Sequence, residues 1–290
     1  MEMFISDLDG TLLDSCAEVS EFSTRCLNDL LNQGMHFTIA TARTPLSALL
    51  ILQKIPITIP MILMNGAFIY CPQENRCLRM VDFGKACVDS LAEIEQTAGI
   101  CGMLFAVEDG KIQIYLKTDK PYLWENYFDH DFLEKFDLVH RDYVEKTVSE
   151  VADKKIIYAM YMDDCPERLN EMAKLLRAQP QLTVDHYKDI YTENRWYVEV
   201  SSAATSKYHA VLWLKEFCRS TNLVGFGDGK NDLPLMEACD EFYAVENACP
   251  ELKKKAGGII KSNKEDGVAR YLMERWNAYK EEKKRKGERK

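Results

Sequence analysis

The sequence predicts an α/β protein in which a parallel-sheet core is interrupted by an inserted α+β domain. Short apolar runs alternate with amphipathic helical stretches between residues 4 and 66, a pattern typical of βαβ units and parallel sheets. Longer alternating patterns replace them between residues 83 and 191, which favours an antiparallel sheet with helices. Short strands and helices then resume as far as residue 276. We therefore expect a core formed by residues 1–82 and 192–290 and an inserted domain formed by residues 83–191.

The first part of the core is expected to run strand, helix, strand, helix, strand. The predicted strands lie at residues 4–6, 36–40 and 61–64. Ser20 is a candidate N-cap for the first helix, and Thr44, followed by proline, is one for the second. The strands end at the polar residues Asp7, Thr41 and Asn65. Because ligands of parallel α/β sheets bind beyond the carboxyl ends of the strands, we expect these three residues to gather at one edge.

The inserted domain is expected to contain strands and helices in alternation. Its predicted strands lie at residues 103–107, 111–117, 156–162 and 182–186. The stretch at 195–200 is interpreted as a strand that returns to the core, and Lys207 follows at the start of a helix. A buried strand at 222–226 then ends in a second acidic segment, 227–232. Further short strands and helices close the core.

Two aspartates one residue apart follow the first strand. In an extended backbone, side chains at i and i+2 point to the same side, so Asp7 and Asp9 should face a common point, and Gly10 lets the chain turn. Carboxylates held this close repel each other, which favours a cation between them. Oxygen ligands favour Mg²⁺. For this segment alone, a surface turn rich in aspartate and glycine is the alternative interpretation.

The composition is that of a globular protein, with 290 residues of which 47% are hydrophobic and 29% charged. Ten scattered cysteines contain no Cys-x-x-Cys pair, which argues against a zinc or redox motif. The net charge of −9 disfavours nucleic acid as a partner. We interpret the basic stretch at residues 280–290 as a solvated helix end. Without a membrane-spanning apolar run or a signal peptide, we expect a cytoplasmic monomer or homodimer with no membrane contact.

Four polar motifs follow strand ends or open a helix in a fixed order. They are Asp-x-Asp-Gly-Thr from Asp7, the hydroxyl of Thr41, the lone Lys207, and Gly-Asp-Gly-x-Asn-Asp at residues 227–232. In isolation Lys207 could be a solvated lysine and the last motif a helix cap. Together and in this order they resemble the motifs of the haloacid dehalogenase superfamily. The segments at 65–67, 246–248 and 266–269 are similar to the Cof-type branch, which carries a type IIB cap between its second and third motifs.

The resemblance covers residues 1–82 and 192–276 and implies a Rossmann-like core with an inserted cap. It implies that Asp7 is the nucleophile, Asp9 the general acid and base, and Lys207 the cation that offsets substrate charge. An aspartyl-phosphate would form on Asp7, splitting one difficult displacement into two steps. The residues that it implies for magnesium are Asp7, Asp9, Asp228 and Asp232. Those that it implies for substrate binding are Gly10, Thr41, Ala42, Arg43, Lys207 and Asn231.

The sequence departs from the family pattern at several points. Ala42 and Tyr208 stand where glycine is usual, and neither replaces a group with a chemical role. An ion pair between Arg43 and the body of the protein is an alternative to substrate contact.

The sequence thus predicts an Mg²⁺-dependent phosphatase that hydrolyses phosphomonoesters of small metabolites, such as sugar phosphates or phosphorylated cofactors. A phosphosugar mutase of the same superfamily and a catalytically silent module that binds phosphorylated ligands are the alternatives.

Overall fold

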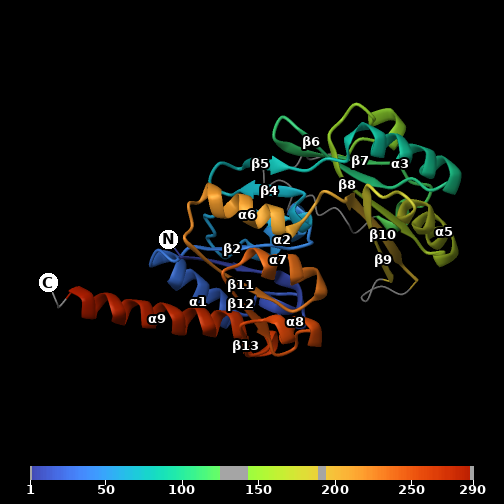
Figure 1. Ribbon diagram of the computed structural model, residues 1–290. Helices are drawn as coiled ribbons and strands as arrows, with labels where there is room; N and C mark the ends of the chain where they lie inside the picture. Colours follow the sequence, from blue (N-terminus) through green and yellow to red (C-terminus); the bar gives the residue numbers. More distant parts are fainter. Residues whose placement is uncertain (1, 125–142, 189–193, 288–290) are drawn as a thin grey trace. The chain divides into compact units, whose positions relative to one another are not determined.

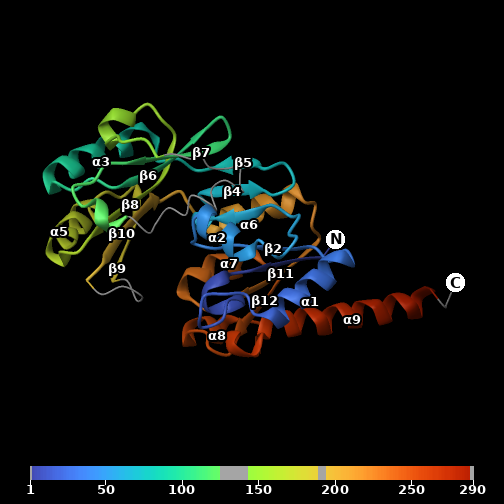
Figure 2. The same cartoon turned by 180° about the vertical axis from the view of Figure 1, so that it is seen from behind.

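The computed structural model describes residues 2–124, 143–188 and 194–287, and the chain forms two compact units (Figures 1 and 2). Unit 1 comprises Met1–Gln73 and Ser206–Lys290, and unit 2 comprises Glu74–Thr205. The units divide at 73/74 and 205/206, whereas the sequence patterns placed the boundaries at 82/83 and 191/192. No helix in the described part of the chain is long and apolar enough to cross a bilayer.

Unit 1 is built on a sheet with the strand order β13-β12-β11-β1-β2, in which the paired strands are parallel. These strands are β1 (Glu2–Ser6), β2 (Phe37–Ile39), β11 (Asn222–Gly227), β12 (Glu241–Val245) and β13 (Gly258–Ile260). The helices are α1 (Glu21–Asn32), α2 (Pro45–Leu52), α6 (Lys207–Phe217), α7 (Leu233–Ala238), α8 (Pro250–Lys255) and α9 (Gly267–Gly287). The predicted α/β fold with a parallel-sheet core is confirmed.

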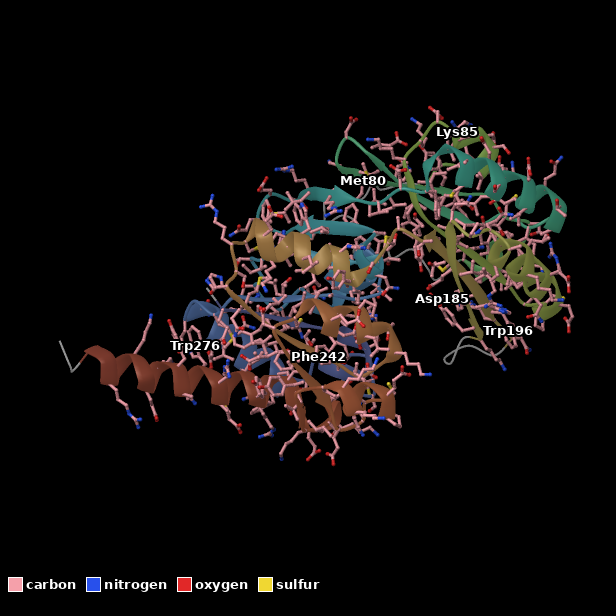
Figure 3. The ribbon with its side chains drawn as sticks, viewed as in Figure 1. Met80, Lys85, Asp185, Trp196, Phe242 and Trp276 are labelled. Atoms are coloured by element: carbon pink, nitrogen blue, oxygen red, sulfur yellow. The ribbon has the colours of Figure 1, made fainter. Side chains whose placement is uncertain are left out.

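Helices α1 and α2 of unit 1 begin where the sequence provides caps. The Ser20 hydroxyl accepts a hydrogen bond from Ser23 N at 3.0 Å, and Thr44 precedes the proline that opens α2, so both predicted caps are confirmed. Helices α1 and α9 lie side by side in both views, and Trp276 of α9 donates to Gln33 at 3.2 Å. Figure 3 shows Trp276 on α9 and Phe242 on β12.

The register of the central strands brings the polar loops to one edge of the sheet. Ser6 of β1 lies opposite Ile39 of β2 and Phe226 of β11, and Asp7 N donates to Phe226 O at 3.0 Å. The next strand, β3 (Met61–Leu63), pairs with β4 (Phe68–Cys71), and a bridge between Ala40 and Ile62 aligns it with β2. Because the chain leaves β1, β2 and β11 in the same direction, the residues after them meet at the carboxyl edge.

Short helical turns carry the polar loops. They are η1 (Leu8–Leu12), η2 (Met64–Gly66), η5 (Lys230–Asp232) and η6 (Asn263–Glu265) in unit 1, and η3 (Pro121–Leu123) and η4 (Val148–Val151) in unit 2.

Unit 2 has a five-stranded antiparallel sheet with the order β7-β6-β8-β10-β9. The strands of this unit are β5 (Arg76–Met80), β6 (Met103–Glu108), β7 (Lys111–Leu116), β8 (Ile156–Asp163), β9 (Leu182–Lys188) and β10 (Trp196–Ser202). Helices α3 (Gly84–Ala98) and α5 (Pro166–Arg177) contribute Leu91, Leu169 and Leu176 to the core of this unit.

The expectation that the strand near residues 195–200 returns to the core is wrong. Strand β10 pairs antiparallel with both β8 and β9, and its inward residues Val198 and Val200 are fully buried in the core of unit 2. The alternation of buried and exposed residues predicts a strand but does not say which sheet receives it. The chain therefore re-enters unit 1 only after Thr205.

Candidate active site

A buried lysine between two buried aspartates lies at the carboxyl edge of the unit 1 sheet. Lys207 Nζ is 2.7 Å from Asp7 Oδ1 and 2.8 Å from Asp232 Oδ1. These residues are 2%, 3% and 0% exposed, respectively. Lys207 is the first residue of α6, whose N-cap Ser206 accepts a hydrogen bond from Tyr208 N at 3.1 Å. The helix start therefore fixes the lysine backbone, and the two carboxylates fix its ammonium group.

Burial and charge shift the ionisation of this cluster. Burial raises the pKa of Asp7 to about 7, even though the neighbouring Lys207 ammonium acts to lower it. Burial alone would lower the pKa of Lys207, but Asp7 and Asp232 raise it above its usual range. The lysine is therefore a permanent cation at neutral pH, and it compensates only part of the negative charge gathered around it.

The third carboxylate of the site belongs to Asp228, which follows β11. Asp7, Asp228 and Asp232 each offer an oxygen atom, and these three oxygens lie within 4.8 Å of one another. Burial, followed by repulsion from Asp232, raises the pKa of Asp228 to about 6. A hard divalent cation bound between these carboxylates would stabilise their ionised form. The three oxygen ligands therefore fit Mg²⁺.

Asp232 has a different role from the other two carboxylates. Its Oδ1 bonds to Lys207, and its Oδ2 accepts hydrogen bonds from Asp228 N and Gly229 N, both at 3.0 Å. Both oxygens are thus engaged in holding the loop after β11 and the lysine. Asp7 and Asp228 are the residues better placed to bind a metal directly.

Gly10 makes room for Asp228. Its φ of +74° lies in the left-handed region, and a Cβ atom built there would lie 2.4 Å from Asp228 Oδ2. Two residues that received no role from the sequence hold this turn: Thr11, the last residue of the Asp-x-Asp-Gly-Thr motif, donates to Asp228 Oδ1 at 3.2 Å, and Asn247 donates to Gly10 O at 2.7 Å. Asn247 stands in the segment that resembles the Cof-type branch, which was the only sequence signal for it.

Asp9 lies apart from the acidic cluster and is paired with Arg43. Arg43 Nε donates to Asp9 Oδ2 and Arg43 Nη2 to Asp9 Oδ1, each at 2.7 Å. The Asp9 side chain is 54% exposed, in contrast to the buried Asp7. Of the two interpretations of Arg43 that the sequence left open, the structure shows the ion pair with the protein itself.

The loop after β2 is closely tied to the turn after β3. The buried Thr41 accepts a hydrogen bond from Arg43 N at 3.1 Å through its hydroxyl and from Asn65 N at 2.9 Å through its carbonyl. Asn65 has a φ of 54°, consistent with a turn-forming residue. Ala42 lies half-buried in the same loop, whereas Asn231 is exposed on η5 and, within the described residues, is not among the side chains that hold Lys207.

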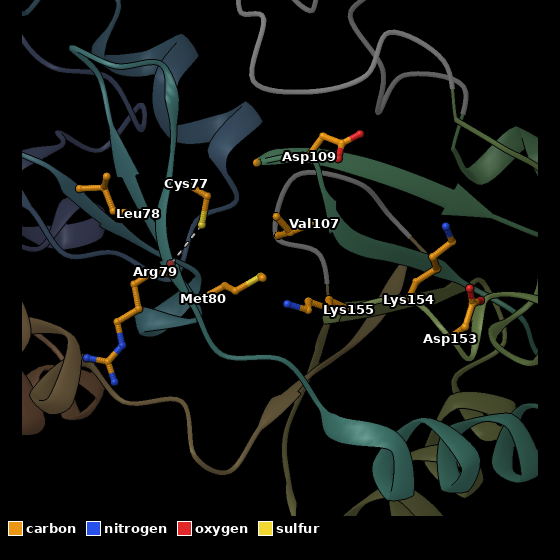
Figure 4. Close-up of a pocket in the computed structure, with 10 residues that line it drawn as sticks. Cys77, Leu78, Arg79, Met80, Val107, Asp109, Asp153, Lys154 and Lys155 are labelled. Carbon is orange, nitrogen blue, oxygen red and sulfur yellow. Dashed lines mark hydrogen bonds between the residues drawn. The ribbon is translucent and has the colours of Figure 1, made fainter.

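Unit 2 contains a concavity of its own, with a volume of about 470 Å³ (Figure 4). Strand β5, the turn between β6 and β7 and the loop before β8 line it. The Lys155 side chain points toward Met80 in this view, while Arg79 extends away from the cavity. Lys154 is already paired with Glu108 at 3.3 Å. Among the described residues, the cluster of three carboxylates that could hold a metal ion lies in unit 1 and not in this concavity.

The chain matches a family of known proteins over most of its length. The family model described as haloacid dehalogenase-like hydrolase matches residues 4–272. The chain is 24% identical over 280 residues to the 5-amino-6-(5-phospho-D-ribitylamino)uracil phosphatase YitU of Bacillus subtilis, covering 92% of this chain and 95% of that protein.

Two solved structures have the same fold. TM0651 from Thermotoga maritima matches with a TM-score of 0.72 and 25% identity over 94% of this chain and 96% of its own. The subclass IIB sugar phosphatase BT4131 matches with a TM-score of 0.64 and 19% identity over 94% and 98%. With a matching family model over nearly its whole length, a shared fold and the four motifs gathered in unit 1, the chain belongs to the haloacid dehalogenase-like hydrolases.

Proposed function

We propose that this protein is an Mg²⁺-dependent phosphatase that hydrolyses phosphomonoesters of small metabolites through an aspartyl-phosphate on Asp7. The observation that carries the proposal is the buried Asp7–Lys207–Asp232 cluster with Asp228 beside it. A phosphomonoester is dianionic, so a carboxylate can attack it only where positive charge offsets the repulsion. Lys207 supplies part of that charge from the protein.

Each side chain has a role in the two half-reactions. One oxygen of Asp7 is held by Lys207 and the other attacks phosphorus, while Asp9 gives a proton to the leaving oxygen. Asp9 then takes a proton from the water that hydrolyses the aspartyl-phosphate. The Thr41 hydroxyl and the Ala42 amide would hold phosphoryl oxygens, with Gly10 and Asn231 beside them, whereas Arg43 is paired with Asp9.

Asp7, Asp228 and the Asp9 main-chain carbonyl would hold the magnesium ion, and Asp232 would steady them. When bound, such an ion would supply positive charge that offsets the negative charge of the phosphoryl group.

The named relatives support a small phosphorylated metabolite as substrate. YitU acts on a phosphorylated ribitylaminouracil and BT4131 is a sugar phosphatase, and both substrates carry a phosphate on a polyhydroxylated carbon chain. We propose a sugar phosphate or a phosphorylated cofactor precursor for this chain, with unit 2 acting as the cap that selects the leaving group.

The experiment is a phosphate-release assay with 4-nitrophenyl phosphate and Mg²⁺, followed by a panel of phosphorylated sugars and cofactors. Asp7→Asn should abolish metal-dependent release, while wild type should liberate inorganic phosphate from at least one metabolite. Transfer of the phosphoryl group to a second sugar without phosphate release would instead identify a mutase. Binding of these esters without any turnover would identify a silent module.

A further inference from the structure

The guanidinium group of Arg43 forms hydrogen bonds to neighbouring residues on the surface of unit 1. Its Nε and Nη2 bond to the two oxygens of Asp9 at 2.7 Å, and its Nη1 donates to Ser47 Oγ at 2.7 Å. All three nitrogens of the guanidinium group therefore have a partner. Fork-to-fork pairing of this kind fixes the carboxylate in both position and orientation.

The backbone of Arg43 is anchored as firmly as its side chain. Its N–H donates to the Thr41 hydroxyl at 3.1 Å, and its carbonyl accepts from Met64 N at 3.1 Å. Ser47, which receives the third guanidinium contact, lies in the first turn of α2. Arg43 thus connects the Asp9 turn to the loop after β2 and to the turn after β3.

Stability does not explain this arrangement. The Asp9 side chain is 54% exposed and Arg43 is 21% exposed, and ion pairs in contact with water add little to folding free energy. An aspartate this exposed would otherwise move among several rotamers. The pair therefore restricts the motion of a side chain that the proposed reaction needs in one place.

We propose that Arg43 is a positioning residue that acts through Asp9, holding its carboxyl group for proton transfer to the leaving oxygen. The inference rests on the proposed phosphatase function. In the first half-reaction the bond from Asp7 to phosphorus forms, the bond from phosphorus to the leaving oxygen breaks, and the Asp9 proton passes to that oxygen. The carboxylate left on Asp9 remains paired with Arg43, ready to take a proton from water in the second half-reaction.

The alternative role for Arg43 is direct binding of the substrate phosphoryl group. The two roles predict different effects of the leaving group on the fall in kcat/KM that removal of Arg43 causes. A leaving group that is itself acidic needs little proton donation, whereas a basic one depends on it. Binding of the phosphoryl group, in contrast, is the same for every ester.

The test measures kcat/KM of the wild type and of Arg43→Met with 4-nitrophenyl, phenyl and 4-methoxyphenyl phosphate. This parameter reports the steps up to release of the phenol, so it isolates the first half-reaction. Arg43→Met should lower kcat/KM by about 100-fold for the 4-methoxyphenyl ester and by less than about 5-fold for the 4-nitrophenyl ester. Arg43→Lys, which keeps the charge but not the fork, should fall between wild type and Arg43→Met.

A double-mutant cycle gives the second readout. If Arg43 acts through Asp9, Asp9→Asn combined with Arg43→Met should be no slower than Asp9→Asn alone. Arg25→Met is the matched control, because Arg25 is an exposed arginine on α1 whose Nε bonds to Glu21 O, and it should leave all three rates unchanged.

If Arg43→Met lowered kcat/KM equally for all three esters, the inference would be overturned and the proposed phosphatase function would stand. The same would follow if the fold-losses of Asp9→Asn and Arg43→Met multiplied in the double variant. A wild type that turns over none of the esters and no metabolite of the panel would overturn the proposed function, and the inference with it.

Discussion

Lys207 and Asp7 are 200 positions apart in the chain, yet their side chains meet at 2.7 Å in an interior from which solvent is almost excluded. The parallel register of β1 and β11 and the start of α6 produce this contact. Asp232 Oδ1 also contacts Lys207 Nζ, at 2.8 Å. Part of the positive charge that the proposed reaction requires is therefore built into the protein.

Removing the lysine charge should cost both activity and stability. In Lys207→Met, Asp7 and Asp232 would remain buried without their cation, and we expect the free energy of unfolding to fall by roughly 3 kcal/mol. Phosphate release should fall by about 1000-fold or more, because attack on a dianion loses its compensating charge. Lys215→Met is the control, since Lys215 pairs with the partly exposed Asp240. Comparable losses in both variants would show that the burial of Lys207 has no special role.

Gly10→Ala tests whether the turn after β1 makes room for Asp228. The new Cβ would lie 2.4 Å from Asp228 Oδ2, so this carboxylate must move, and the Mg²⁺ concentration that gives half-maximal activity should rise about 10-fold or more.

Gly34→Ala is a matched control for this variant. Gly34 also has a positive φ, +89°, but nothing lies within 4 Å of an added Cβ. Gly34→Ala should lose about 1 kcal/mol of stability through backbone strain and keep its metal dependence. An unchanged metal requirement in Gly10→Ala would contradict the account of this turn.

Glu95 should make the stability of unit 2 depend on pH. Burial raises the pKa of this carboxyl group from 4.5 to about 7. Because the folded state holds the proton more tightly than the unfolded chain, the contribution of Glu95 is favourable at low pH and is lost as pH rises from about 4.5 through about 7. At pH 8, Glu95→Gln should be more stable relative to wild type than at pH 5, by roughly 2–3 kcal/mol.

Urea unfolding at the two pH values measures this difference. Glu93→Gln is the control, because Glu93 is exposed on the same helix and should show no such change. A stability difference between Glu95→Gln and wild type that is the same at both pH values would contradict this prediction.

Much of the fold followed from local patterns. The caps at Ser20 and Thr44 and the parallel core were predictable, because capping and short-strand alternation depend on residues adjacent in sequence. The sequence did not predict which sheet β10 joins, because a strand with alternating burial has the same sequence pattern in either sheet. Strand pairing is decided by contacts among β8, β9 and β10 that no local pattern records.

The candidate site, like the fold, was only partly predictable from the sequence. The motifs pointed to Asp7, Lys207, Asp228 and Asp232 as a group, and the structure brings these four together. The motifs could not indicate that Asp232 uses both oxygens to hold its surroundings. Nor could they decide whether Arg43 faces substrate or Asp9, because that depends on the direction of a long side chain.

Asp7 is proposed to carry the phosphoryl group during turnover. The most direct measurement is acid quenching of the wild type in the first milliseconds of reaction with 4-nitrophenyl phosphate and Mg²⁺, followed by mass spectrometry of the peptides. We expect a phosphoryl adduct on the peptide that contains Asp7, formed together with the first equivalent of nitrophenol and absent from Asp7→Asn. Release of nitrophenol with the adduct on another residue, or undiminished release by Asp7→Asn, would contradict this expectation.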